Sequence, residues 1–142
     1  MKKYFYYVSY YKISPENICE SFGIGYFSSK AKAYAAVKML ADKEGFDKGQ
    51  GEFEVTKFAV NFVDGIDIDK ETVTLYEVSH EYQDEDGYDI WEIFGVFSTL
   101  QEAEICLKKK RALSPYCDYP EGFCIADCKI NICGWSEGFT PW

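Results

Sequence analysis

Histidine, the side chain that most often acts as a general acid or base, is scarce in this chain. The chain contains a single histidine, His80, and only four prolines and two methionines among 142 residues. A Ser/His/Asp or Cys/His site is therefore possible only around His80, and no nucleophile-elbow turn accompanies it. The pairs Gly23-x-Gly25 and Gly49-x-Gly51 lack the lysine and the following pattern of a phosphate-binding loop. We therefore expect a protein that is not an enzyme, with no catalytic residue and a structural His80.

Long apolar runs are also lacking. No stretch approaches the roughly 20 apolar residues of a transmembrane helix, and no small-residue cleavage site follows the aromatic N-terminal stretch. We therefore expect a cytoplasmic protein without membrane contact, whose six cysteines are thiols. Cys117, Cys124, Cys128 and Cys133 contain no CxxC pair and have no neighbouring histidine, so no metal or other cofactor is predicted.

Positive charge is scarce in one half of the chain only. Residues 1–70 contain ten Lys/Arg and ten Asp/Glu, whereas residues 71–142 contain five and fourteen, so the second half carries the whole net charge of −9. This charge disfavours direct binding to nucleic acid, because the phosphates repel it. Such asymmetry indicates a polarised surface rather than general solubility.

The chain contains an internal sequence repeat. A shift of 70 positions aligns the two halves without a gap. The identical pairs include Tyr6/Tyr76, Val8/Val78, Ser9/Ser79, Gly25/Gly95, Phe27/Phe97, Ser28/Ser98, Ala33/Ala103, Lys38/Lys108, Phe53/Phe123 and Asn61/Asn131. We expect two repeats, residues 1–70 and 71–142. Units of this size are marginal alone, so they should form one compact body.

Each repeat predicts the order strand, strand, helix, strand. The predicted ranges are 3–13, 18–27, 30–44 and 53–62 in the first repeat, and 73–82, 88–97, 100–113 and 123–132 in the second. Asp86-Gly87 predicts a hairpin turn between the first two strands of the second repeat. Ser28 and Ser98 are the expected helix N-caps.

The last strand of each repeat changes its alternation. In the first repeat, apolar residues occupy odd positions up to Val55 and even positions from Phe58 onward, and the second repeat does the same. This change predicts a β-bulge near residues 56–57 and 126–127. The predicted fold is α+β: two tandem ββαβ units that form a joint, mostly antiparallel sheet with both helices on one face.

The second repeat resembles a known family. The residues that carry the resemblance are His80-Glu81-Tyr82, Phe94 to Thr99, Tyr119-Pro120-Glu121-Gly122-Phe123 and Trp135-Ser136-Glu137-Gly138-Phe139. Over roughly residues 73–140 the chain is similar to a small bacterial domain family of unknown function, which has Tyr-x-Pro-Glu-Gly-Phe and Trp-x-Glu-Gly-Phe motifs. The first repeat departs from both motifs. The resemblance implies a bacterial or phage origin and assigns no activity.

The segment 81–92 is the richest in carboxylates and aromatic rings. The candidate partner-binding residues are Glu81, Tyr82, Asp84, Glu85, Asp86, Tyr88, Asp89, Trp91 and Glu92. An EF-hand is excluded, because Tyr82 and Ile93 would occupy its first and last ligand positions. Catalytic carboxylates are disfavoured, since nothing on a solvated turn would raise their pKa values. The segment is either a surface for a basic partner or a turn that keeps the protein soluble.

We therefore expect an acidic interaction protein that binds and masks a basic surface of a partner protein. Inhibitors, anti-defence proteins and immunity proteins act in this way, and a nucleic-acid-binding protein is one such partner. The alternative is a small-ligand-binding protein with an aromatic pocket between the two repeats. The sequence leaves open whether the first repeat is only scaffold and whether the Tyr-rich sheet face is exposed.

Overall fold

The computed structural model describes four stretches of the chain, residues 2–13, 19–48, 51–62 and 73–138. The predicted turn at 14–17, the link at 64–72 and the end of the aromatic tail lie outside these stretches. No helix within the described stretches has the length and apolar character needed to cross a bilayer.

Both halves contain two strands, a helix and a third strand, in that order. The first half comprises β1 (Lys2–Ile13), β2 (Cys19–Phe27), α1 (Lys30–Leu40), the short 3-10 helix η1 (Phe46–Lys48) and β3 (Gly51–Asn61). The second comprises β4 (Thr74–Gln83), β5 (Asp89–Phe97), α2 (Leu100–Arg111), the 3-10 helices η2 (Tyr116–Asp118) and η3 (Pro120–Gly122), and β6 (Phe123–Lys129). Each predicted strand and helix corresponds to one of these elements, although α1 ends before the predicted residue 44.

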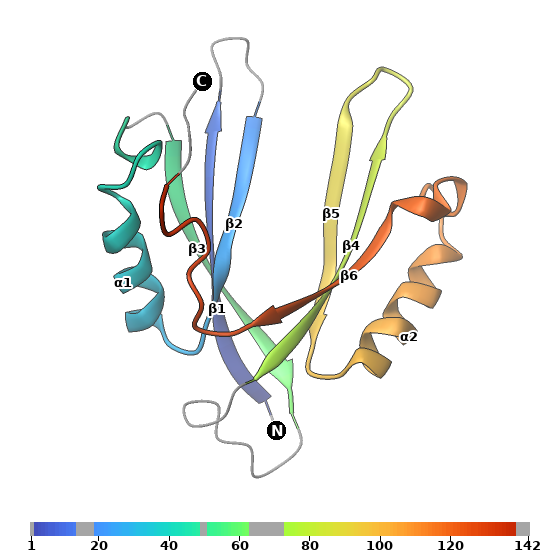
Figure 1. The fold of residues 1–142 in the computed structure, drawn as a ribbon. Helices are drawn as coiled ribbons and strands as arrows, with labels where there is room; N and C mark the ends of the chain where they lie inside the picture. Colours follow the sequence, from blue (N-terminus) through green and yellow to red (C-terminus); the bar gives the residue numbers. More distant parts are fainter. Residues whose placement is uncertain (1, 14–18, 49–50, 63–72, 139–142) are drawn as a thin grey trace.

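The strands form two separate antiparallel sheets instead of the predicted joint sheet. Their strand orders are β2-β1-β3 and β5-β4-β6, so β1 and β4 are the central strands. Figure 1 shows the sheets facing each other, with α1 and α2 on the outer sides of the molecule. The α+β class is therefore correct. The joint sheet is wrong, and the helices lie on opposite sides, because each sheet covers the other's inner face.

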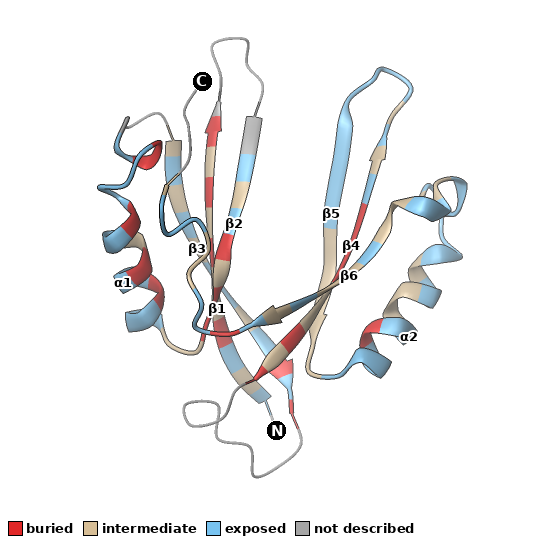
Figure 2. Ribbon diagram, in the orientation of Figure 1, coloured by how far each residue is buried: buried red, intermediate tan, exposed pale blue. Residues whose placement is uncertain are grey.

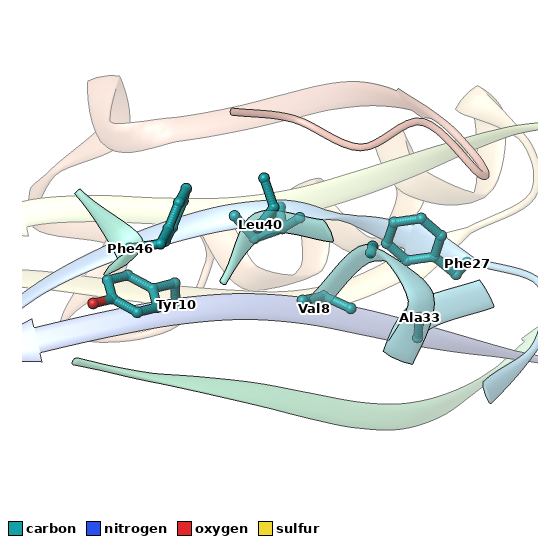
Figure 3. Packing of buried hydrophobic residues seen from close by; sticks show 8 residues of the cluster. Val8, Tyr10, Phe27, Ala33, Leu40 and Phe46 are labelled. Carbon is teal, nitrogen blue, oxygen red and sulfur yellow. The ribbon is translucent and has the colours of Figure 1, made fainter. Parts of the chain in front are cut away.

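One hydrophobic cluster lies between the first sheet and α1. Its buried members are Val8, Tyr10, Ile24, Phe27, Ala33, Ala36, Leu40 and Phe46. Figure 3 shows Leu40 of α1 and Phe46 packed over Val8 and Tyr10 of β1. The helix contributes Ala33, Ala36 and Leu40 at helical spacing, so a single face of α1 is buried.

A second hydrophobic cluster joins the two halves. Its buried members are Phe5, Tyr26, Val60 and Phe62 from the first half and Val73, Leu75 and Ile130 from the second. Phe5 and Leu75 are both 0 % exposed and lie on the central strands. In Figure 2, burial is concentrated in β1, the inner side of α1 and the base where the sheets meet, whereas most of α2 and the outer end of β5 are exposed.

The last strand of each half changes its alternation of apolar residues, but no bulge in that strand causes the change. β1 and β3 keep one unbroken register, and so do β4 and β6, so the predicted bulges at 56–57 and 126–127 are wrong. Val55 packs into the cluster under α1, whereas Phe58 packs into the cluster between the sheets. The alternation changes because the strand leaves one core and enters another on its opposite face.

The register shifts lie in the hairpins instead. They occur between Val8 and Ser9 in the β1–β2 pair and between Val78 and Ser79 in the β4–β5 pair. One residue of each edge strand, Ile24 or Phe94, is left without a partner across the ladder. These bulges are the same distance into each half, and a glycine follows each of them.

The helix caps lie one residue later than predicted. The side chain of Ser29 accepts a hydrogen bond of 3.2 Å from the backbone N–H three residues on, at the start of α1. Thr99 makes the same 3.2 Å bond at the start of α2. Ser28 and Ser98 are therefore not the caps.

Ser28 and Ser98 instead contact the opposite half. The Ser28 N–H donates to Asn131 Oδ1 at 2.9 Å. The Ser98 hydroxyl donates to the carbonyl oxygen of Asn61 at 2.6 Å. The shared serine and asparagine positions of the two halves are thus contacts between the halves.

The chain after β6 crosses to the first half and pairs with the free edge of β2. The Asn131 N–H donates to the Tyr26 carbonyl at 2.8 Å, and the Gly134 N–H donates to the Ile24 carbonyl at 2.8 Å. Trp135 follows and remains 43 % exposed. This segment covers an edge strand that would otherwise present unpaired backbone groups.

We expect Leu75→Ala to lower the free energy of unfolding by about 2–5 kcal/mol, because it empties part of the cluster that both halves share. Leu113→Ala is the matched control, since Leu113 is 50 % exposed, and it should cost no more than about 0.5 kcal/mol. Urea unfolding followed by circular dichroism should show one transition. Two transitions in the wild type, or equal losses in the two variants, would contradict a shared core.

We expect Asn131→Ala to cost about 2 kcal/mol, because it removes a side-chain hydrogen bond and places alanine in the left-handed region. Asn131 has a φ of 61° and accepts from Ser28. Asn131→Gly loses the same hydrogen bond without the backbone cost, so it should destabilise less. Thermal unfolding measures both variants, and an equal loss would show that the backbone conformation does not contribute.

Candidate functional site

The candidate residues lie on the β4–β5 hairpin, whose tight turn the sequence predicts correctly. Asp84 Oδ1 accepts hydrogen bonds from the backbone N–H groups of Asp86, at 3.0 Å, and Tyr88, at 2.9 Å. Gly87 has a φ of 84°, which a residue with a side chain rarely adopts. Asp84 therefore holds the turn together, and its carboxylate is half-buried rather than fully presented to solvent.

Most of the remaining candidate residues are exposed. Tyr88 is 70 % exposed and Trp91 is 51 % exposed. The exposed carboxylates are those of Glu81, Glu85, Asp86, Asp89 and Glu92. The hairpin therefore presents large aromatic side chains to solvent among negative charges.

The strand register divides these residues between two faces. Glu81 lies opposite Trp91, and alternate residues of a strand share a face, so these two side chains lie on the inner face with Asp89. Tyr82 and Glu92 lie on the other face, which α2 covers. The sequence grouped all of these residues as one candidate surface, but the alternation of side chains along each strand places them on opposite faces of the sheet.

The outer-face residues are engaged in the second half's own packing. The ring of Tyr82 stacks on that of Tyr119 with centroids 4.5 Å apart. Glu92 accepts a hydrogen bond from the Tyr116 hydroxyl, which together with burial raises the pKa of that tyrosine. These contacts indicate a structural role for Tyr82 and Glu92.

His80 lies at the centre of this packing. It is 1 % exposed, and its ring centroid lies 4.4 Å from that of Phe123 and 5.1 Å from that of Tyr116. Its Nε2 lies 2.8 Å from the Tyr119 carbonyl oxygen, so Nε2 carries the proton and donates. Nδ1 is buried without a hydrogen-bond partner among the described residues. This geometry fits a packed structural histidine.

The Tyr-Pro-Glu-Gly-Phe segment builds the wall around His80. Tyr119 supplies the carbonyl acceptor, and Phe123 supplies the ring contact. A Cβ on Gly122 would lie 2.1 Å from the Glu81 carbonyl oxygen and 2.9 Å from His80 Nε2, so only glycine fits. The motif therefore serves packing in this chain.

Two cavities are lined by residues of both halves, where the alternative prediction placed an aromatic pocket without naming the residues that line it. One, of about 460 Å³, is lined by Tyr7, Tyr26 and Phe58 of the first half and by residues 93–97 of β5. The other, of about 500 Å³, is lined by Tyr7 and Tyr26 together with Glu77 and residues 127–129 of β6. Tyr7 and Tyr26 line both cavities, so they lie where the two spaces meet.

Glu77 contributes a negative charge to this region. The Tyr26 hydroxyl donates a hydrogen bond to its carboxylate, and burial followed by this bond raises the pKa of Tyr26. Burial, then the charge of Glu77, raises the pKa of Tyr7 to about 12 and that of Cys128 to about 11. The repeat alignment contains a signal for this site, because the two halves differ there: position 7 of the first half is a tyrosine and the corresponding position 77 of the second half is a glutamate.

Thiols and possible metal ligands add no further centre. Cys106, Cys117, Cys124, Cys128 and Cys133 are free thiols. Within the described residues, no three His, Cys, Asp or Glu side chains gather as metal ligands would. The ionisable side chains of the residues that line the cavity beside β6 are those of Tyr7, Tyr26, Glu77, Asp127, Cys128 and Lys129.

We expect the free energy of unfolding to fall between pH 10 and about pH 12. The unfolded chain ionises its tyrosines at about 10, whereas folded Tyr7 keeps its proton until about 12. The unfolded state thus loses protons first, so this contribution to stability is complete below pH 10 and is lost as the pH approaches 12. Near-ultraviolet absorbance measures tyrosinate formation. Glu77→Gln should lower the pKa of Tyr7, and ionisation of every tyrosine near pH 10 would contradict the burial.

Comparisons with protein-family models, curated protein sequences and solved structures found no match for this chain. The resemblance of residues 73–140 to a bacterial domain family therefore stays a prediction, and the function is argued from the residues themselves.

Proposed function

We propose that this chain is a non-enzymatic, acidic interaction protein that binds and masks a basic surface of a partner protein, as inhibitors, anti-defence proteins and immunity proteins do. The observation that carries this proposal is the exposure of Tyr88 and Trp91 among the carboxylates of the hairpin. Exposed aromatic rings commonly anchor protein interfaces. Carboxylates around them attract a basic partner and select against acidic ones. A turn that served solubility alone would not need an exposed tryptophan.

The proposal includes action in the cytoplasm of a bacterium or of a phage-infected cell. The free thiols of the described cysteines are compatible with a reducing compartment. The net charge of −9 disfavours nucleic acid itself as the partner, but it suits a basic protein that binds nucleic acid.

We also propose that the two halves arose from one duplicated ββαβ unit. Support comes from the identical element order and from the register shifts at Val8/Ser9 and Val78/Ser79. The Ser–Asn contacts between the halves add to this support, because each half supplies both kinds of residue. The hairpin of the second half would then have gained its charge after the duplication.

A second candidate function is the binding of a small ligand between the halves. The two cavities of about 460 and 500 Å³ favour it, since they fall within the size range of ligand pockets. Their walls include Tyr7, Tyr26 and Phe58, which are apolar with polar hydroxyl groups at two positions.

We expect the combined variant Asp84→Asn, Glu85→Gln, Asp86→Asn and Asp89→Asn to bind basic proteins at least about tenfold more weakly, because it removes four negative charges from the hairpin. Asparagine at position 84 keeps the side-chain oxygen that holds the turn. Capture from a bacterial lysate at low and at high salt, followed by mass spectrometry and by titration of the captured basic protein, measures the change.

A matched control removes the same number of charges elsewhere. Asp42, Glu44, Asp47 and Glu104 are exposed and lie away from the hairpin. Their Asn and Gln replacements should leave the affinity within about twofold, because long-range charge alone contributes little in salt. Equal weakening in the two combined variants would show that net charge, rather than the hairpin, attracts the partner.

A further inference from the structure

The inner faces of the two sheets continue outward beyond the shared core as two rows of side chains. Phe5 and Leu75 belong to that core, so alternate residues along the same strands share their face. On the first sheet the row consists of Tyr7, Ser9 and Tyr11 on β1, opposite Thr56, Glu54 and Glu52 on β3. On the second it consists of Glu77, Ser79, Glu81 and Gln83 on β4, opposite Val96, Ile93, Trp91 and Asp89 on β5.

These facing rows are rich in tyrosine and strongly acidic. They carry five carboxylates, those of Glu52, Glu54, Glu77, Glu81 and Asp89, and neither row includes a lysine or an arginine at these described positions. Glu54, Glu81 and Asp89 are exposed, so the outer part of the space between the rows is open to solvent. The first half therefore contributes two of the five charges, although its net charge is zero.

The cavity beside β6 lies at the inner end of these rows. It has a volume of about 500 Å³, and its lining residues include Tyr7, Tyr26, Glu77 and Asp127, with Lys129 as the single cation. The Tyr26 hydroxyl bond occupies one acceptor site of Glu77, and a carboxylate offers about four. Glu77 thus keeps acceptor capacity for a ligand beside two aromatic rings.

Arginine is the side chain that best matches this environment. Its planar guanidinium stacks on aromatic faces and makes paired hydrogen bonds to carboxylates, and it loses less on leaving water than an ammonium does. Electrostatic attraction to the ring faces adds to the pairing. The raised pKa values of Tyr7 and Cys128, to which Glu77 contributes, are consistent with a negative potential at this point.

We infer that an extended, arginine-bearing segment of the partner protein enters the space between the two sheets, where one arginine occupies the cavity at Tyr7, Tyr26 and Glu77 and a second pairs with Glu81. This inference rests on the proposed binding of a basic partner. It moves the main contact from the turn of the hairpin to the inner face and makes the first half part of the site. Along β4, Glu77 and Glu81 are separated by roughly 13 Å, which matches arginines four residues apart in an extended peptide.

The test uses the full chain and a short glycine/serine peptide with arginines at positions i and i+4. The same peptide with citrulline at both positions is the neutral control, because citrulline keeps the shape of arginine without its charge. Isothermal titration calorimetry measures the affinity. The fluorescence of Trp91, which lies opposite Glu81 on the inner face, reports the place of binding in a chain that carries Trp135→Phe and Trp142→Phe.

We expect the arginine peptide to bind and the citrulline peptide to fail. Glu77→Gln with Glu81→Gln should weaken binding at least about tenfold, whereas Asp42→Asn with Glu104→Gln should change it by no more than about twofold. Asp42 follows α1 and Glu104 lies on α2, so this pair removes equal charge away from the space. Glu81→Gln alone should also weaken binding, and its exposed position means that the fold is not at risk.

Three results would overturn the inference: equal binding of both peptides, equal weakening by the two double variants, or unchanged binding in Glu77→Gln with Glu81→Gln. If Glu77→Gln with Glu81→Gln leaves binding unchanged, the combined variant of Asp84, Glu85, Asp86 and Asp89 separates the two proposals. Loss of basic-protein capture by that combined variant would support the proposed function and contradict only the site between the sheets. Retention of capture by that combined variant, with loss in the Glu77/Glu81 variant, would support the inner site over the turn.

Discussion

The packing of the two sheets against each other is the contact on which the rest of the structure depends. Phe5 and Leu75 lie on the central strands of different halves and are fully buried in the cluster between them. α1 and α2 cover only the outer faces, so each inner face remains apolar at its base and needs the other. The shared cluster gives each half buried apolar surface that a unit of about 70 residues would lack alone.

The same packing also creates the candidate site. The sheets meet at Phe5 and Leu75, and the residues farther along the same strands are tyrosines and glutamates that do not close the space. Large aromatic side chains at Tyr7 and Tyr26 leave cavities on either side of the contact. In the proposed assignment, stability and binding belong to alternate residues of one strand, with Leu75 in the shared core and Glu77 in the proposed site.

Much of the fold could be predicted from the sequence. The errors occurred where the structure depends on contacts between residues that are far apart in the chain. The 70-residue register located the strands and helices, and Asp86-Gly87 located the hairpin turn correctly. The bulge was predicted on the wrong strand. The apolar alternation changes between Val55 and Phe58, and the same sequence pattern arises from a bulge or from a strand whose two faces pack into different cores. Ser28 has the chemistry of a cap, yet its partner Asn131 is distant in sequence.

The candidate site was predictable only in part, because it also depends on contacts between residues that are distant in sequence. Composition showed that segment 81–92 is acidic and aromatic, and the exposure of Tyr88 and Trp91 agrees with a surface role. Which residues share a face depends on the pairing of β4 with β5, and which face is open depends on the other half. The sequence therefore did not predict a role for Glu77, since its surroundings include Tyr7 and Tyr26, more than 50 residues earlier in the chain.

The pairing of the C-terminal segment with β2 has a consequence for synthesis on the ribosome. The carbonyl groups of Ile24 and Tyr26 leave the ribosome more than 100 residues before Asn131 and Gly134, which cover them. During that interval a nascent first half presents an open strand edge to any extended segment nearby. The same segment from a neighbouring copy has the right residues to occupy that edge, so crowding of nascent chains favours domain-swapped assemblies.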